Sequence, residues 1–169
     1  ESDYEFETYP ESAIQSFDNS TPIDKYKEAW RIYKKEVIDS IPHLEVSEKE
    51  KMKKRKAPFY IMADFLMAHL IVVSIAEIEG TGEGNLFVYN PKEGIYQPAW
   101  DIVTKLVRRL EPSFRSNDIS EIICTLSCIC NNVSIYQGSR YIALGNCIYD
   151  TYYRYGMKYS PSIVFTHKV

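Results

Sequence analysis

Apolar residues recur at three- and four-residue steps over residues 21–42, and this spacing predicts that the first element of the fold is a helix with one apolar face. The face consists of Ile23, Tyr26, Trp30, Tyr33, Val37 and Ile41. Thr21 precedes Pro22, which predicts Thr21 as the N-cap and Pro22 as the first helical residue. Pro42 ends the pattern, because proline lacks the amide hydrogen that a helix interior needs. A helix that is apolar on one side must pack against a core, so we expect a globular chain.

A second, short helix is predicted to begin at Ser47, because Ser47 and Glu50 have the spacing of a capping box. Its body, residues 48–56, contains Met52 as its single strongly apolar residue. A helix that is polar on all sides is either solvated or docked on a charged partner. This helix is therefore expected at the surface.

The rest of the chain mixes helical and strand patterns. Residues 86–90 and 95–96 flank a Pro–Gly turn, which predicts a β-hairpin. The elements expected after residue 60 are a helix over about 61–68, a strand over 70–75, the hairpin over 86–96, helices over about 100–110 and 118–130, and strands from Arg140 to the end. This order predicts an α+β fold in which N-terminal helices (21–68) are followed by a mixed helix and strand part (69–169) with C-terminal strands.

Charge is distributed unevenly along the chain, although the net charge is only −3. Residues 1–20 contain six acidic groups and no basic one, whereas residues 21–60 contain eleven basic and seven acidic groups. We expect residues 1–20 to be an acidic linker and residues 21–169 to be a single domain excised from a longer chain. The composition, 45% hydrophobic and 25% charged, excludes a disordered chain, a collagen-like repeat and a coiled-coil rod.

The longest apolar run and the cysteines both favour a cytoplasmic protein with no membrane partner. The run, residues 61–76, contains Asp64 and His69 and is too short to span a bilayer. Three of the four cysteines lie within seven residues, namely Cys124, Cys128 and Cys130, and residues 1–20 do not have the pattern of a signal peptide. Zinc sites need paired ligands on turns, so these thiols are expected to be reduced, metal-free and buried in a helix interface.

No catalytic, cofactor-binding or metal-binding site is predicted from the sequence. The glycine loop over residues 80–84 lacks the Lys and Ser/Thr that a phosphate-binding Walker loop requires after its last glycine. Beyond the acidic residues 1–20, the chain also lacks an Asp-x-Asp or Asp-x-Glu pair of the kind that holds two metal ions in polymerases and primases. The three histidines are scattered, so a small enzyme whose site assembles from distant residues stays an open alternative.

Two groups of residues are candidates for nucleic-acid binding. Five cations lie within six residues, and they could displace counterions from a phosphate backbone; they are Lys51, Lys53, Lys54, Arg55 and Lys56. Tyrosines interleaved with cations near the C-terminus could stack on unpaired bases; the candidates are Tyr153, Arg154, Tyr155 and Lys158. The alternatives are a solvated helix face for the first group and ordinary strand packing for the second.

The hairpin carries a recognisable pattern. Leu-Phe-Val-Tyr-Asn over residues 86–90, followed by Gly94-Ile95-Tyr96, resembles the L-x-V-Y-N…G-x-Y hairpin of phage and plasmid primase–helicases, a family related to the poxvirus primase–helicase. In that family the hairpin lies in the domain just before the superfamily-3 helicase. The resemblance extends over residues 57–169.

Segments nearer the C-terminus follow the same family in order and spacing. Asn-Cys-Ile-Tyr-Asp over residues 146–150 resembles its Asn-Gly-Val-x-Asp strand, with Cys147 in place of the usual Gly. Tyr159-Ser160-Pro161 and Phe165-Thr166 then resemble the segments that lead into the helicase.

The resemblance implies a non-catalytic domain of a mobile-element DNA primase–helicase, which would link the primase and helicase parts and support assembly and DNA engagement in the bacterial cytoplasm. ATP and Mg²⁺ would belong to the helicase domain that follows, and the full-length protein would be a hexamer. The partners implied are single-stranded or forked DNA and the adjacent domains of the same chain. A free-standing protein-interaction or regulatory module of a phage or plasmid is the alternative.

Overall fold

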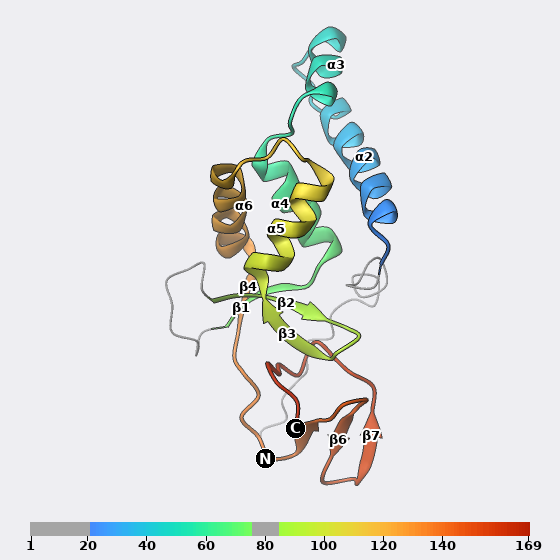
Figure 1. Ribbon diagram of the computed structural model, residues 1–169, viewed down its shortest axis with the longest axis vertical. Coiled ribbons are helices and arrows are strands. Elements are labelled where there is room, and N and C mark those ends of the chain that lie inside the picture. Colours follow the sequence, from blue (N-terminus) through green and yellow to red (C-terminus); the bar gives the residue numbers. More distant parts are fainter. Residues whose placement is uncertain (1–20, 76–84) are drawn as a thin grey trace.

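A computed structural model describes residues 21–75 and 85–169, and it has the predicted α+β fold. Helices form one end of the molecule, a sheet crosses its middle, and a small set of strands forms the opposite end (Figure 1). The expected linker over residues 1–20 and the glycine loop over residues 80–84 lie outside the described residues.

The described helices precede and follow the hairpin, as the sequence pattern predicts. Their bounds are α2 (Ile23–Asp39), α3 (Val46–Lys54), α4 (Phe59–His69), α5 (Ala99–Leu110) and α6 (Ser116–Ile129). Among the described residues, no helix is both long enough and apolar enough to cross a membrane.

The strands form two separate sheets. The larger sheet contains β1 (Val72–Ile75), β2 (Leu86–Asn90), β3 (Ile95–Pro98) and β4 (Asn131–Val133), in the order β3-β2-β1-β4. Strand β4 is parallel to β1, and the other neighbours are antiparallel. The smaller sheet is an antiparallel meander of β5 (Tyr141–Ala143), β6 (Ile148–Asp150) and β7 (Tyr155–Met157).

Strand β2 is buried on both faces and separates two cores. Leu86 and Val88 face the helices, because alternate side chains of a strand point to opposite sides of a sheet. They belong to the larger core, whose helical members include Trp30, Phe65, Leu66, Val103, Val107, Ile122 and Leu126. Burying each such side chain stabilises a fold by about 1.5–3 kcal/mol.

The opposite face of the sheet is covered by the C-terminal part of the chain. Phe87, Tyr89 and Tyr96 form the smaller core together with Val73, Ile75 and Val164. The buried Tyr96 hydroxyl donates a hydrogen bond to the Pro161 carbonyl oxygen at 2.7 Å. The segment after the meander therefore contributes to the core of the sheet.

The helix starts lie slightly away from those predicted. The capping pair of α3 is Glu45 and Glu48 rather than Ser47 and Glu50, and the Glu45 amide donates to a Glu48 carboxylate oxygen at 3.3 Å. Helix α6 begins two residues before Asp118. Both differences have one cause: a carboxylate at the third helical position can reach back to the capping amide whichever residue precedes it.

Two strand predictions are wrong. No strand is predicted between the helix over 118–130 and Arg140, but residues 131–133 form β4, which pairs with β1 through Val73↔Asn131, Ser74↔Asn132 and Ile75↔Val133. Asparagine has low strand propensity, so this pairing reflects the tertiary position of the segment. Strands were also expected to the end of the chain, but residues 158–169 contain none, because this segment packs side chains under the sheet instead of adding a strand.

Candidate nucleic-acid interface

Helix α3 is attached to the molecule by charged groups rather than by apolar packing. It has no buried residue. The Lys53 ammonium lies 2.6 Å from an Asp39 carboxylate oxygen at the end of α2, and Lys49 donates to the Asp39 carbonyl at 2.8 Å. The hydrogen bond from Lys53 holds the pKa of Asp39 below its ordinary value, and the same contact raises the pKa of Lys53. Helix α3 is thus docked on α2 through its charges, one of the two situations expected for a helix polar on all sides.

Two of the five candidate cations of this region are engaged within the chain. Lys53 pairs with Asp39 and also with Glu50 at 2.9 Å. Lys56 lies 2.8 Å from both carboxylate oxygens of Asp118 in the first turn of α6. The pKa of Asp118 is lowered, first by Lys56 and then by the Arg115 amide. These lysines position the α3 region against α2 and α6.

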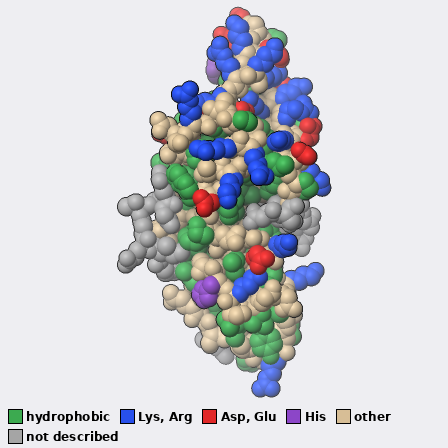
Figure 2. All heavy atoms as spheres, viewed as in Figure 1, with side chains coloured by type: hydrophobic (Ala, Val, Ile, Leu, Met, Phe, Trp, Pro, Cys, Tyr) green, Lys and Arg blue, Asp and Glu red, His purple; other side chains and the backbone are tan. Residues whose placement is uncertain are grey.

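The other three candidate cations, Lys51, Lys54 and Arg55, are exposed and form no ion pair with any residue of the described part of the chain. Figure 2 shows Lys and Arg side chains gathered over the end of the molecule that α2 and α3 form. We call Lys51, Lys54 and Arg55 the α3 cations.

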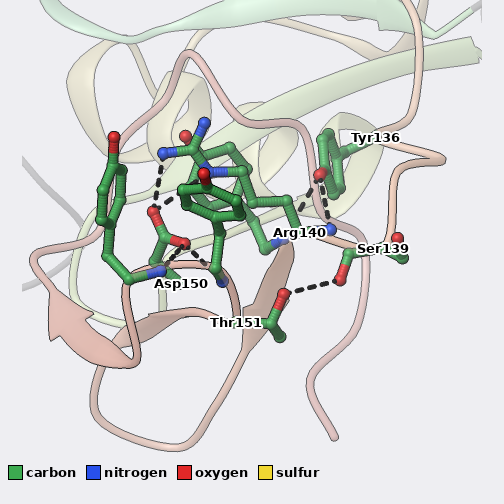
Figure 3. Close-up of polar contacts among 8 residues, drawn as sticks. Tyr136, Ser139, Arg140, Asp150 and Thr151 are labelled. Atoms are coloured by element: carbon green, nitrogen blue, oxygen red, sulfur yellow. Dashed lines mark hydrogen bonds and ion pairs between the residues drawn. The ribbon is translucent and has the colours of Figure 1, made fainter.

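The meander at the opposite end is organised around a buried carboxylate. The Asp150 side chain is 1% exposed, and Arg140 donates to its Oδ2 atom through Nε at 3.1 Å and Nη2 at 3.0 Å (Figure 3). Its Oδ1 atom accepts the amides of Tyr152 and Tyr153 at 2.9 and 3.1 Å. The Arg140 guanidinium, aided by the two amides, holds the pKa of Asp150 below its ordinary value against the opposing effect of burial.

Three tyrosine rings surround the Arg140 guanidinium. Its central carbon lies 5.0 Å from the ring centroid of Tyr141, 5.7 Å from that of Tyr152 and 5.1 Å from that of Tyr153. Such cation–π contacts stabilise by about 0.5–1 kcal/mol each at exposed sites. The rings of Tyr152, Tyr153 and Tyr155 are nevertheless 75%, 62% and 50% exposed. We call these three residues the tyrosine face.

Two neighbouring tyrosines, Tyr149 and Tyr159, have packing roles. Tyr149 is half-buried in β6. The Tyr159 hydroxyl donates to the Leu144 carbonyl at 2.8 Å, and its ring lies against Gly94. Ordinary strand packing, the alternative to base stacking, therefore describes Tyr149 and Tyr159 but not the three residues of the tyrosine face.

The two remaining candidates of this group, Arg154 and Lys158, are exposed and form no ion pair with a described residue. Arg154 is the described non-glycine residue with positive φ, at 58°, in the turn between β6 and β7. Sequence reasoning did not single out Arg140 or Tyr141. One feature of the sequence could have pointed to the Arg140–Asp150 pair: Asp150 is the single acidic residue between positions 130 and 169.

The cysteines do not lie where they were expected. Cys124 and Cys128 are exposed on α6 and Cys130 is half-buried, so the prediction of buried thiols in a helix interface is wrong for the first two. Positions 124 and 128 turn away from the face of α6 that Ile119, Ile122, Ile123 and Leu126 bury. Burial raises the pKa of the Cys130 thiol. Within residues 21–75 and 85–169, no group of three His, Cys, Asp or Glu side chains is arranged to hold a metal ion.

The segments that carry the family resemblance contact each other in space. The backbone amide of Tyr96, in the hairpin, donates to the Phe165 carbonyl at 2.7 Å, and the Tyr96 hydroxyl donates to Pro161. Gly94 of the same hairpin lies against the Tyr159 ring. These segments, about 65 residues apart in sequence, form one packing unit on the sheet face opposite the helices.

No protein-family model matches the chain, and no curated protein matches its sequence. The functional argument therefore rests on two surfaces: the α3 cations at one end and the tyrosine face at the other.

Proposed function

We propose that this chain is a non-catalytic DNA-binding domain of a mobile-element primase–helicase that acts in the bacterial cytoplasm. The observation that carries the proposal is the state of the α3 cations, which are exposed on a helix that buries no side chain. Within the described fold these cations form no ion pair, and their one evident structural role is that Lys51 and Lys54 lie in the last turn of α3, where positive charge suits the helix dipole. Their exposure favours contact with a phosphate backbone.

The surrounding contacts support this interpretation. Lys53 and Lys56 are held by carboxylates, so α3 is fixed on α2 and its end is fixed on α6. The backbone that carries the α3 cations is therefore already ordered, so less of the binding free energy is spent on ordering that backbone. Contacts of this kind are independent of sequence and have dissociation constants of about 10⁻⁴ to 10⁻⁶ M.

The family resemblance supplies the proposed context. The domain would connect a primase part to a superfamily-3 helicase in a hexamer, and ATP and Mg²⁺ would be bound by the helicase. Several copies in one assembly would raise the effective concentration of the α3 cations along the DNA, so weak single contacts would act together.

Charge reversal tests the proposal. The triple variant Lys51→Glu, Lys54→Glu and Arg55→Glu leaves the structural pairs of Lys53 and Lys56 intact. We expect it to weaken binding of a short DNA duplex and to reduce the slope of log affinity against log salt by about 2–3, because each lost phosphate contact removes about 0.9. Fluorescence anisotropy across a salt series measures both quantities.

A matched control separates local contact from net charge. The variant Lys25→Glu, Lys27→Glu and Lys92→Glu changes the net charge equally at exposed positions away from α3. It should retain most of the affinity and the salt slope. The proposal is overturned if both triple variants bind alike, or if the unmodified chain binds neither duplex nor single-stranded DNA at low salt.

A protein-interaction module is the second candidate, and the exposed tyrosine face favours it, since tyrosine and arginine are enriched at the centres of protein interfaces. A chain that binds neither duplex nor single-stranded DNA at low salt would support this candidate.

A further inference from the structure

The C-terminal part of the chain differs from the rest in composition. Residues 130–169 contain seven of the fourteen tyrosines and four basic residues, against one acidic residue, Asp150. Because Asp150 is buried and paired with Arg140, it places almost no negative charge on the surface. In Figure 2 the meander end displays hydrophobic-class side chains, which include tyrosine, with isolated Lys or Arg side chains. This surface is aromatic and positively charged.

The tyrosine face is held in place although it is exposed. Asp150 accepts the amides of Tyr152 and Tyr153 and thereby fixes the loop that carries both rings. The ring of Tyr153 lies 4.9 Å from that of Tyr152 and 6.4 Å from that of Tyr155, between centroids. Asp150 itself is fixed by Arg140, as Figure 3 shows. A ligand that stacks on these rings would not need to order them first.

The backbone of Arg154 adds a second, independent observation. A positive φ at a non-glycine residue costs roughly 1–2 kcal/mol relative to the usual right-handed conformation. Glycine would adopt this turn conformation freely. The chain instead has an exposed arginine there, between Tyr153 and Tyr155 in sequence. Arg154 closes the turn, because its amide donates to the Asp150 carbonyl at 2.7 Å, so the chain keeps a cation at a turn position where glycine would be less strained.

We propose that the tyrosine face binds single-stranded nucleic acid, with unpaired bases stacking on Tyr152, Tyr153 and Tyr155 and with Arg154 and Lys158 contacting the phosphates. This inference rests on the proposed DNA-binding function and specifies the form of nucleic acid. In a duplex each base already stacks between its neighbours, so an aromatic surface selects strands whose bases are free.

The tyrosine face and the α3 cations lie at opposite ends of the molecule (Figure 1). The two surfaces are therefore separable by mutation. Charge complementarity favours a nucleic acid over an acidic protein here, because the exposed aromatic rings match bases while the neighbouring cations match phosphates.

The test compares two oligonucleotides of equal length, oligothymidylate and an abasic strand that carries the same phosphates without bases. The unmodified 169-residue chain should bind oligothymidylate more tightly. The double variant Tyr153→Ala and Tyr155→Ala should lose at least about 30-fold of that affinity, since two stacked bases contribute about 1–3 kcal/mol each and every 1.4 kcal/mol is tenfold. Its affinity for the abasic strand should not change.

Two controls keep the test interpretable. Tyr60 in α4 is 50% exposed, as Tyr155 is, and the variant Tyr60→Ala should bind like the unmodified chain. Tyr153→Phe with Tyr155→Phe keeps both rings and should retain affinity. Circular dichroism of each variant verifies that the fold is intact.

The outcomes separate this inference from the proposed function. If the alanine variant keeps full affinity while reversal of the α3 cations abolishes binding, the tyrosine face is not a stacking site and the DNA-binding function stands. Equal affinity of the unmodified chain for oligothymidylate and the abasic strand also overturns the inference. The inference is likewise overturned if an acidic peptide, which has no bases, displaces oligothymidylate completely. If the unmodified chain binds no DNA at all, both proposals fail.

Discussion

Arg140 donates two hydrogen bonds to a single carboxylate oxygen of Asp150, from Nε at 3.1 Å and from Nη2 at 3.0 Å. The other oxygen remains available for the amides of Tyr152 and Tyr153. One buried aspartate therefore joins the first strand of the meander to the turn that presents the tyrosine face. The turn that carries the exposed rings is thus held by the carboxylate with which Arg140 pairs.

We expect protonation of Asp150 to contribute to acid denaturation. Arg140 lowers the pKa of Asp150 in the fold below its ordinary value of 3.8. The ion pair therefore stabilises the fold at pH values above the unfolded-state pKa, and this contribution is lost as pH falls through the lower folded-state pKa. Asp150→Asn removes it at every pH. The difference in free energy of unfolding between the two proteins should be largest near neutral pH and should shrink below about pH 4.

Urea denaturation over a series of pH values measures this difference. For Arg140→Gln, the difference in free energy of unfolding from the unmodified protein should shrink at low pH in the same way, because removal of either partner abolishes the ion pair. If the free energies of unfolding of the variant and the unmodified protein differ by the same amount at every pH, the contribution of the ion pair does not depend on protonation of Asp150.

Gly94→Ala is expected to destabilise the fold by about 2–5 kcal/mol, the sum of a left-handed backbone penalty and overpacking. Gly94 has a φ of 69°, and a Cβ atom there would lie 2.1–2.6 Å from three ring atoms of Tyr159. Gly145→Ala is the matched control, because a Cβ atom there meets nothing within 4 Å. It should change the free energy of unfolding by about 0.5 kcal/mol or less. Chemical denaturation compares the two variants, and equal losses would contradict the argument.

The fold was largely predictable where the pattern is local. The apolar period of α2 and the turn residues of the hairpin are properties of short segments, and both elements form near the predicted positions. Strand β4 could not be predicted, because Asn131 and Asn132 have low strand propensity and pair only through the position of β1. Helix starts shifted by two residues because more than one side chain can cap an amide.

The candidate surfaces were only partly predictable. A run of cations is visible in sequence, but the carboxylates that hold Lys53 and Lys56 come from α2 and α6, 14 residues before Lys53 and 62 residues after Lys56. Likewise Arg140 and Asp150 are ten residues apart, and they meet because the strand register pairs Tyr141 with Asp150. Contacts of this kind depend on register and packing, which propensity does not encode.

A partly buried polar network at the end of α5 gives a further prediction. Trp30 Nε1 and Lys34 Nζ both donate to Glu111 Oε1, at 3.2 and 2.6 Å, and Lys34 also donates to the Arg55 carbonyl at 2.7 Å. The side chains of Lys34 and Glu111 are each 12% exposed. Glu111→Ala leaves two donors without this acceptor and should cost about 1.5–3 kcal/mol.

Thermal or chemical denaturation measures the loss at Glu111. Glu28→Ala is the control, since it removes a carboxylate from an exposed pair with Arg31 on α2, and exposed pairs of this kind contribute little. If both variants lose the same stability, the Glu111 network is no more than a surface ion pair.

Arg154→Gly should stabilise the fold and weaken single-strand binding at the same time. Glycine removes the strain of a positive φ, which is partly offset by the greater freedom of glycine in the unfolded chain, so a net gain of up to about 1 kcal/mol is expected. The loss of one cation should lower the salt slope for oligothymidylate by about 0.7. Arg154→Lys should keep the slope with unchanged stability, because it retains both the charge and the strain. A glycine variant that gains stability without losing affinity would show that the strained arginine does not contact the strand, and binding would then depend on the rings and Lys158.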